Sequence, residues 1–183
     1  SHFVPAAEAA LKRIADGEPA QPANFLVKKF DQKKAAKEEA RTLLAQAESS
    51  IYNDHDYKRA IRDYQTLIDK FPSTIYADSA QFMMGMCYGW LFEPQKQIQA
   101  FQKAVENYPS ASAHYYLASA YQRQGQFKEA LEQYKAMLQN YPDTYYWQRL
   151  LAEYNIAQCL ESSQRFDEAI EQYDKFLAQY GES

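Results

Sequence analysis

Apolar residues recur every three or four positions through most of this chain, which is the period of an amphipathic α-helix. Four segments repeat one order: a small or polar residue, an aliphatic residue, an aromatic residue three positions later, and a second aromatic residue before proline or glycine. Because proline cannot donate to the helical hydrogen-bond ladder, each segment is predicted to be a helix that ends at this point. The four segments are AIRDYQTLIDKFP (60–72), QIQAFQKAVENYP (97–109), ALEQYKAMLQNYP (130–142) and AIEQYDKFLAQYG (169–181).

A second helical segment precedes each of these four and has an apolar face of its own. Three of the upstream segments carry a small residue at one shared position, where two helices are expected to approach closely: Gly85, Ala118 and Ala157. The chain is therefore predicted to be all-α and to contain four helix pairs.

The order of small and aromatic residues resembles the tetratricopeptide repeat, whose pattern W-x2-L-G-x2-Y…A-x3-F…P extends over ~34 residues. The resemblance covers Arg41–Ser183 and implies an α-solenoid of antiparallel helix pairs. About four repeats are expected, at 41–74, 78–111, 111–144 and 150–183. The chain departs from the pattern at Gln97, which replaces the usual alanine, and at Glu48, where a small residue is expected. The tryptophan position holds Leu44, Gln81, His114 and Glu153.

The spacing of the repeats predicts two long connectors. Ala60 and Gln97 are 37 residues apart, Gln97 and Ala130 are 33 apart, and Ala130 and Ala169 are 39 apart. The connectors FPSTIYADSA (71–80) and YPDTYYWQRLLAE (141–153) resemble those of bacterial cell-envelope repeat proteins, such as outer-membrane assembly lipoproteins and Tol–Pal-associated proteins. This resemblance implies the periplasm or the periphery of the outer membrane, with a cytoplasmic location as the alternative.

Residues 1–40 are expected to form an N-terminal helical extension that caps the first repeat. A short helix is predicted at 6–16 and a proline-containing linker at 18–24, after which the apolar pattern runs on from Phe25 into the first repeat. A degenerate extra repeat is the alternative.

The C-terminal repeat is expected to be incomplete. A solenoid needs a terminal element with a polar outer face, and nothing after 183 is present to cover Phe176 and Leu177. Since the sequence starts at Ser1 and not at methionine, it is interpreted as a fragment of a longer protein. The alternative is that another chain completes the stack, which would make a homo-oligomer through this repeat.

The charge balance speaks against a nucleic-acid partner, because the net charge is −4 and the pI is near 5.4. The basic stretch from Lys28 to Arg41 is interpreted as a solvated helix face in preference to a site for an anionic partner. No apolar run approaches ~18 residues, so no integral membrane segment is expected.

No catalytic, metal or cofactor site is predicted, and the protein is not expected to be an enzyme. Cys87 and Cys159 occupy equivalent helix positions two repeats apart, too distant for a disulfide, and are expected to be buried. The run Asn53–Asp56 is interpreted as a helix-capping turn in preference to a metal site. No G-x-S-x-G elbow and no phosphate-binding glycine loop occurs.

The resemblance implies a binding groove lined by the first helices of successive repeats. Phe82, Tyr115 and Tyr154 are expected to form an aromatic ladder, with Arg123 as a partner for a carboxylate. Because no lysine occupies the positions that grip acidic chaperone tails, such a clamp is disfavoured. The alternative to a groove is that the rings cover connectors or fill gaps between helices. The predicted groove residues are Tyr52, Asn53, Phe82, Met86, Trp90, Tyr115, Ser119, Arg123, Tyr154 and Gln158.

The sequence thus predicts a non-catalytic scaffold that binds a peptide or protein segment in this groove, and the resemblance of the connectors implies a place within a bacterial envelope complex. Two alternatives remain open: a self-assembly module that uses the uncapped C-terminal repeat, and an accessory domain of a larger enzyme.

Overall fold

The computed structural model describes residues 23–181, with side chains described from residue 33 onward. The predicted helix at 6–16 and most of the predicted linker lie outside these residues. The chain divides into two compact units, Ser1–Glu39 and Ala40–Ser183. Helix α2 (Ala23–Tyr52) begins in the first unit and ends in the second, as the apolar pattern from Phe25 predicts. Ala23 and Asn24, expected in the linker, already belong to α2.

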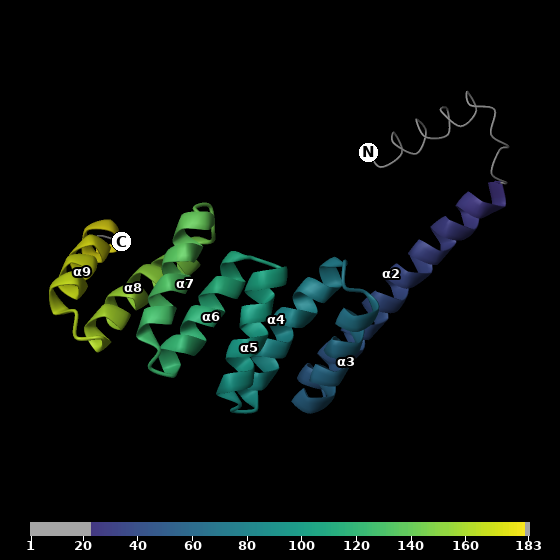
Figure 1. Ribbon diagram of the computed structural model, residues 1–183, viewed down its shortest axis with the longest axis horizontal. Helices are drawn as coiled ribbons and strands as arrows, with labels where there is room; N and C mark the ends of the chain where they lie inside the picture. Colours follow the sequence, from purple (N-terminus) through teal and green to yellow (C-terminus); the bar gives the residue numbers. More distant parts are fainter. Residues whose placement is uncertain (1–22, 182–183) are drawn as a thin grey trace, which may run out of the picture. The chain divides into compact units, whose positions relative to one another are not determined.

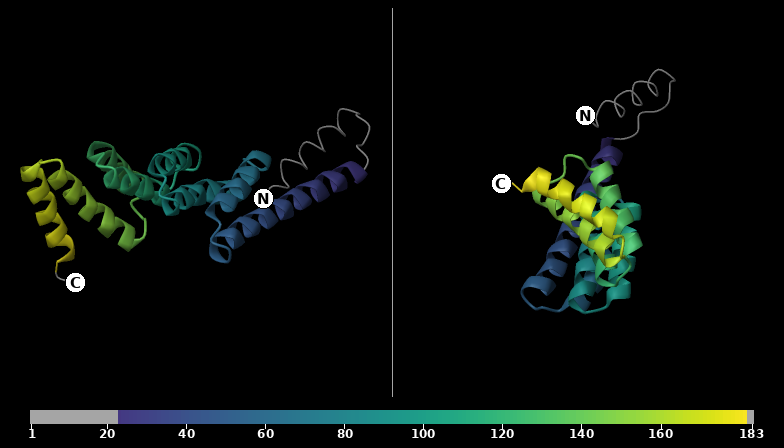
Figure 2. Two further views of the ribbon diagram at one scale, coloured as in Figure 1. Left: turned by 90° about the horizontal axis from the view of Figure 1, so that it is seen from below. Right: turned by 90° about the vertical axis from the view of Figure 1, so that its left-hand side faces the viewer.

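The second unit is a succession of helices that follow one another in chain order (Figure 1). The described residues of this unit contain no β-strand, and each helix packs mainly on its neighbours in the chain (Figures 1 and 2). This confirms the all-α solenoid. After α2, the helices are α3 (Tyr57–Lys70), α4 (Ile75–Trp90), α5 (Pro94–Asn107), α6 (Ala111–Arg123), α7 (Phe127–Asn140), α8 (Tyr146–Ser162) and α9 (Phe166–Tyr180).

The two helices of each pair are joined by a tight turn that contains one residue with positive φ. These residues occupy the same place in all four turns: His55 (φ 54°), Phe92 (φ 57°), Gly125 (φ 72°) and Gln164 (φ 61°). In the first turn, the Asp56 side chain accepts a hydrogen bond from the backbone N–H of Arg59 and caps α3. The prediction of a capping turn at Asn53–Asp56 is confirmed.

The prediction of two long connectors is wrong, because most of their residues are helical. Residues 71–74 join α3 to α4, and residues 141–145 join α7 to α8. The extra residues lengthen the first helices instead: α4 has 16 residues and α8 has 17, whereas α6 has 13. At α4 the cause is Thr74, whose side chain accepts a hydrogen bond from Ala77 N–H and starts the helix directly after the turn at Pro72.

The largest fully buried side chains of the core come from one fixed position of the second helices. Tyr64, Phe101 and Tyr134 are completely buried there. Gly85 of α4 lets the Phe101 ring lie against the helix backbone, since a Cβ at this glycine would be 2.5 Å from the ring. The close approach predicted for the small residues is confirmed at this position. Cys87 and Cys159 are free and buried, also as predicted.

Helix α9 exposes an apolar stripe at steps of four and seven residues. Phe166, Ile170 and Leu177 are 58%, 60% and 60% exposed. The expected lack of cover is therefore confirmed for Leu177. It is wrong for Phe176, whose ring is half-buried against Tyr154 and Tyr180, at centroid distances of 5.6 and 4.9 Å.

Candidate functional site

Two open pockets lie between α4 and α6, the first helices of the second and third repeats, and both are lined by Tyr116. The first has a volume of about 640 Å³ and the second about 830 Å³. We call the two pockets together the α4–α6 groove. The first pocket lies at the turn that follows α4, and the second lies where α4 and α6 begin and includes the start of α8.

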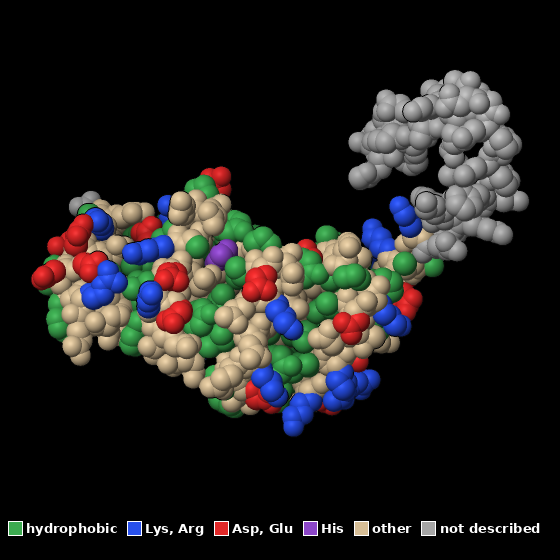
Figure 3. Space-filling view, viewed as in Figure 1, with side chains coloured by type: hydrophobic (Ala, Val, Ile, Leu, Met, Phe, Trp, Pro, Cys, Tyr) green, Lys and Arg blue, Asp and Glu red, His purple; other side chains and the backbone are tan. Residues whose placement is uncertain are grey.

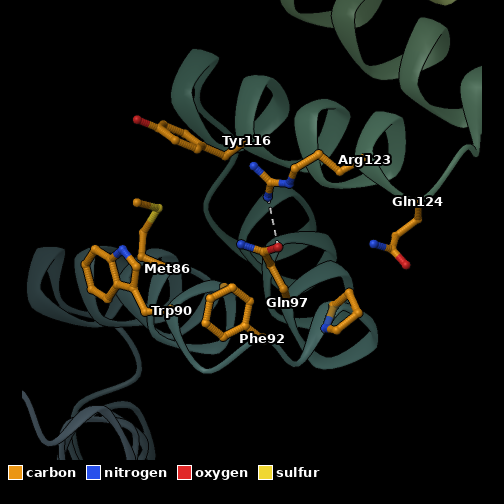
Figure 4. A pocket seen from close by; sticks show the side chains of 9 residues that line it. Met86, Trp90, Phe92, Gln97, Tyr116, Arg123 and Gln124 are labelled. Atoms are coloured by element: carbon orange, nitrogen blue, oxygen red, sulfur yellow. Dashed lines mark hydrogen bonds between the residues drawn. The ribbon is translucent and has the colours of Figure 1, made fainter.

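The first pocket gathers apolar side chains from α4 and its turn opposite a cation from α6. Met86 and Trp90 reach it from α4, Phe92 from the turn, and Arg123 from the end of α6 (Figure 4). The Trp90 ring also packs on Tyr57 of α3 at a centroid distance of 5.2 Å. This contact fixes one side of the indole while the other remains open to the pocket.

Arg123 is held in place by neutral groups. Its Nη2 donates to Oε1 of Gln97 at 2.9 Å (Figure 4). Its Nη1 lies 3.5 Å from the Ser119 hydroxyl. Gln97 is only 8% exposed, and it fits because Gly89 leaves space where a side chain would overlap it. No described carboxylate forms an ion pair with Arg123, so its charge is uncompensated at the pocket.

Phe92 is the least expected residue of the first pocket. It is 90% exposed, and its backbone lies in the left-handed region at φ 57°. For a bulky residue this conformation costs roughly 1–3 kcal/mol, and an exposed ring recovers little of that by packing. Phe92 therefore contributes nothing evident to the stability of the turn, which favours a role in contact with another molecule.

The second pocket is richer in aromatic rings and has the opposite charge. The Phe82 ring meets the Tyr116 ring edge-on, with 5.2 Å between the ring centroids. The centroid of the Trp147 ring lies 6.3 Å from that of Tyr115. Two carboxylates, Glu48 and Asp78, are the charged groups of this pocket, and neither forms an ion pair among the described residues. On the face of the molecule shown in Figure 3, acidic and basic side chains are interspersed.

The structure brings part of the predicted site together. Met86, Trp90 and Arg123 share the first pocket, with Ser119 in contact with Arg123, and Phe82 lines the second. The remaining predicted residues line neither pocket: Tyr52, Asn53, Tyr115, Tyr154 and Gln158.

The predicted aromatic ladder of Phe82, Tyr115 and Tyr154 does not form. Phe82 contacts Tyr116 instead of Tyr115, and Tyr116 in turn contacts Tyr115. Tyr154 packs on Tyr173 and Phe176 of its own repeat. The reason is that the neighbouring position on α6 also holds a tyrosine, and its ring occupies the space beside Phe82.

Several of the other predicted residues have local roles. Asn53 donates to the Ser49 hydroxyl at the end of α2, beside the exposed Tyr52. Gln158 accepts a weak hydrogen bond from Gln122, whose carbonyl oxygen accepts another from the hydroxyl of the buried Tyr134 at 2.9 Å. These contacts stabilise turns and helix packing and leave the groove to other residues.

The groove residues that were missed in the sequence include Phe92, Gln97, Tyr116 and Trp147, as well as the carboxylates Glu48 and Asp78. Gln97 did carry a signal, because it departs from the alanine of the repeat pattern. Phe92 carried one too, since the other three turns place histidine, glycine or glutamine at its position. Trp147 lies in the segment that was expected to be a connector.

The two cysteines of the described residues are poorly suited to covalent chemistry. Burial raises the pKa of the Cys87 thiol to about 12 and that of Cys159 to about 11, so both are poor nucleophiles. No group of three or more histidine, cysteine or acidic residues could hold a metal ion within the part of the chain that the structure describes. None of the described helices combines the length and apolarity needed to cross a bilayer. The groove offers rings, one guanidinium and two carboxylates.

Comparison with known proteins matches the helix pairs to one repeat family. Two tetratricopeptide repeat models match this sequence, one at residues 41–74 and 79–111 and the other at 98–145 and 123–183. Together they cover more than half of the chain. No curated protein matches the sequence.

Solved structures share the fold at low sequence identity. A crystal structure of the MamA protein is 23% identical, with a TM-score of 0.64, and the match covers 80% of this chain and 79% of that one. A tetratricopeptide repeat protein from Parabacteroides merdae is 17% identical, with a TM-score of 0.68 over 80% of this chain and 55% of that one. A putative kinesin light chain of Podosopora anserina with nearly identical TPR-like repeats is 17% identical, with a TM-score of 0.61 over 79% and 76%.

Proposed function

Because this chain belongs to the tetratricopeptide repeat family, we propose that it is a protein-interaction scaffold that binds a segment of a partner protein in the α4–α6 groove. In this proposal, residues 41–183 form the four-repeat scaffold and residues 1–40 form its N-terminal extension. The chain performs no catalysis of its own.

The observation that carries this proposal is the gathering of exposed aromatic side chains around the groove. Trp90 and Phe92 are exposed at the first pocket, and Tyr145 and Trp147 at the second. Exposed rings of this size are unfavourable in water unless another surface covers them. Tryptophan, tyrosine and arginine are also the residues that most often dominate the free energy of binding at protein interfaces.

The proposal can be tested with a defined probe, a phage-displayed library of random dodecapeptides selected on the whole chain. Selected peptides, synthesised and labelled, should bind with a dissociation constant in the micromolar range by fluorescence anisotropy. Trp147→Ala should weaken binding at least about fivefold, the loss expected when a contact residue of this kind is truncated.

Tyr146→Ala is the matched control for this experiment. Tyr146 is 61% exposed and adjacent to Trp147, but it lines neither pocket and packs on Tyr180. Its removal should leave the affinity unchanged. A selection that yields no peptide dependent on Trp147 would contradict the assignment of the groove.

A second candidate function, self-association through α9, is supported by the register of the repeats. The positions of Phe166, Ile170 and Leu177 correspond to Tyr57, Ile61 and Ile68 of α3, where the first helix of the next repeat packs over them. The equivalent apolar residues of α5 and α7 are covered by α6 and α8 in the same way. Since this chain supplies the covering helix three times, we propose that a second copy supplies it at α9.

Self-association would be visible in the molar mass measured by light scattering across a range of concentrations. We expect the wild-type chain to be a dimer and the Ile170→Ser/Leu177→Ser variant to be a monomer. Gln172→Ser, a change on another side of the same helix, should leave the dimer intact. A mass that stays monomeric at every concentration would exclude this function for the chain.

A place in a bacterial cell-envelope complex is a further proposal that rests on the connector sequences FPSTIY and YPDTYY alone. Fractionation of the native host with an antibody against this chain would test it. Recovery in the periplasmic or outer-membrane fraction is expected, and recovery with the cytoplasmic fraction would contradict it.

A further inference from the structure

The first pocket has a feature that a purely apolar anchor site does not need, a cation built in beside the rings. The Arg123 guanidinium has five N–H donors, and the contacts to Gln97 and Ser119 use only two of its nitrogens. Donors therefore remain free for a ligand next to Trp90 and Phe92. The neutral partners fix the orientation of the guanidinium without compensating its charge.

The support of Arg123 is itself specific to this repeat. Gln97 stands where the equivalent positions of the other repeats hold alanine, at Ala60, Ala130 and Ala169. A buried amide costs free energy unless it is hydrogen-bonded, and here Oε1 of Gln97 accepts from Arg123 while Gly89 makes room for the side chain. Gly89 and Gln97 together thus hold the Arg123 guanidinium in one orientation at the pocket.

We infer that the first pocket binds a carboxylate next to a bulky apolar side chain in the captured segment, with Arg123 paired to the carboxylate and the Trp90 and Phe92 rings covering the apolar group. This inference rests on the proposed function and specifies the ligand of the same groove. The carboxylate belongs to an aspartate, to a glutamate or to the end of the partner chain.

The charges of the second pocket set the direction of the bound segment. Glu48 and Asp78 repel a second carboxylate and favour a lysine or arginine there. A segment with its acidic group at Arg123 and a basic group toward Trp147 is complementary to both ends. The reversed segment would place like charges together at both pockets.

Covering by the rings makes the ion pair at Arg123 stronger than an ordinary surface pair. An exposed pair is weakened by water and salt, but a pair enclosed by Trp90, Phe92 and the apolar group of the ligand loses part of its solvent. We therefore expect the carboxylate to contribute about a tenfold gain in affinity, typical of a hydrogen bond to a charged group. Part of this gain should disappear at 1 M salt.

The test is a double-mutant cycle on the whole chain with the library-selected peptides. Each peptide is synthesised with its acidic residue kept and with that residue changed to asparagine or glutamine, or with its free C-terminus amidated. The wild-type chain should bind the acidic form about tenfold more tightly. Arg123→Gln, which keeps amide donors near Gln97 but removes the charge, should bind both forms equally.

Lys128→Gln is the control for net charge, because Lys128 is exposed on α7 and lines neither pocket. This variant should retain the tenfold preference. If selected peptides bind the groove but show no preference for the carboxylate, or keep that preference in Arg123→Gln, the inference is wrong and the proposed function stands. If no peptide depends on the groove, the proposed function fails and the inference fails with it.

Discussion

Tyr64 and Tyr134 occupy the same position in the second helices of the first and third repeats, but only the hydroxyl of Tyr134 has hydrogen-bond partners. Tyr134 donates to Oε1 of Gln122 at 2.9 Å and accepts from Nδ2 of Asn155 at 3.1 Å. The Tyr64 hydroxyl is buried and has no partner among the described residues. Burial raises the pKa of both phenols, so both remain neutral at physiological pH.

This difference predicts opposite effects of one substitution. Tyr64→Phe should raise the free energy of unfolding by about 1 kcal/mol, because it removes a buried polar group that forms no hydrogen bond. Tyr134→Phe should lower it by about 1 kcal/mol, because Gln122 and Asn155 lose a partner. Urea denaturation followed by circular dichroism measures the free energy of unfolding of both variants. Equal effects would contradict the finding that only the Tyr134 hydroxyl is hydrogen-bonded.

Phe92 is expected to lower the stability of the fold while it strengthens peptide binding. Phe92→Asn is expected to raise the free energy of unfolding by about 1 kcal/mol, since asparagine tolerates the left-handed conformation better and the exposed ring is removed. The same variant should weaken peptide binding, because the first pocket loses one wall. Thermal unfolding measures the change in stability, and fluorescence anisotropy titrations measure the change in peptide affinity.

Gln164→Asn is the matched control for the change at Phe92, because Gln164 has the same positive φ in the turn of the fourth repeat and lines neither pocket. It should stabilise the chain without altering affinity. A Phe92→Asn variant that binds peptides as well as the wild type would remove Phe92 from the site.

Gly85 should not tolerate even a methyl group. In Gly85→Ala the added Cβ would lie 2.5 Å from the Phe101 ring, which is completely buried and cannot move aside cheaply. We expect the free energy of unfolding to fall by about 1–3 kcal/mol, which is typical of overpacking in a core. An unchanged urea midpoint would show that the α4–α5 contact is looser than described.

The two cysteines should be inert in the folded chain. Their pKa values, raised by burial to about 12 at Cys87 and about 11 at Cys159, predict no reaction with a disulfide reagent at pH 8 until urea unfolds the protein. In the unfolded chain the thiols lose their protons near pH 9, whereas in the folded chain they keep them. Stability should therefore fall as the pH rises above 9, and it should fall less in a Cys87→Ala/Cys159→Ala variant. Rapid labelling of the native chain would contradict the burial.

The fold could be predicted from the sequence because the signal is repeated. The anchors Tyr64, Phe101 and Tyr134 recur in one pattern, and a pattern that appears four times leaves little room for another architecture. The helix starts were less predictable: the spacing showed extra residues within 71–80 and 141–153 but could not say whether they were loop or helix. The capping hydroxyl of Thr74 decides this at α4, and its effect is local.

The site was predicted only in part, for a reason of geometry. Repeat positions identified Met86, Trp90 and Arg123, which do share a pocket. They could not rank Tyr116 above Tyr115, because both are half-buried neighbours and only packing shows which ring reaches Phe82. Gln97 and Phe92 break the repeat pattern, and in this chain such departures mark the groove better than agreement with the pattern does.

The central claim, that the α4–α6 groove binds a protein segment, is tested most directly by backbone amide chemical shifts in the ¹⁵N-labelled chain titrated with a selected dodecapeptide. The account predicts that the largest shift changes cluster at residues 78–97, 104–124 and 145–148, the segments that, together with Glu48, hold the residues lining the two pockets. Shift changes confined to residues 149–180, or spread evenly over all the helices, would contradict it.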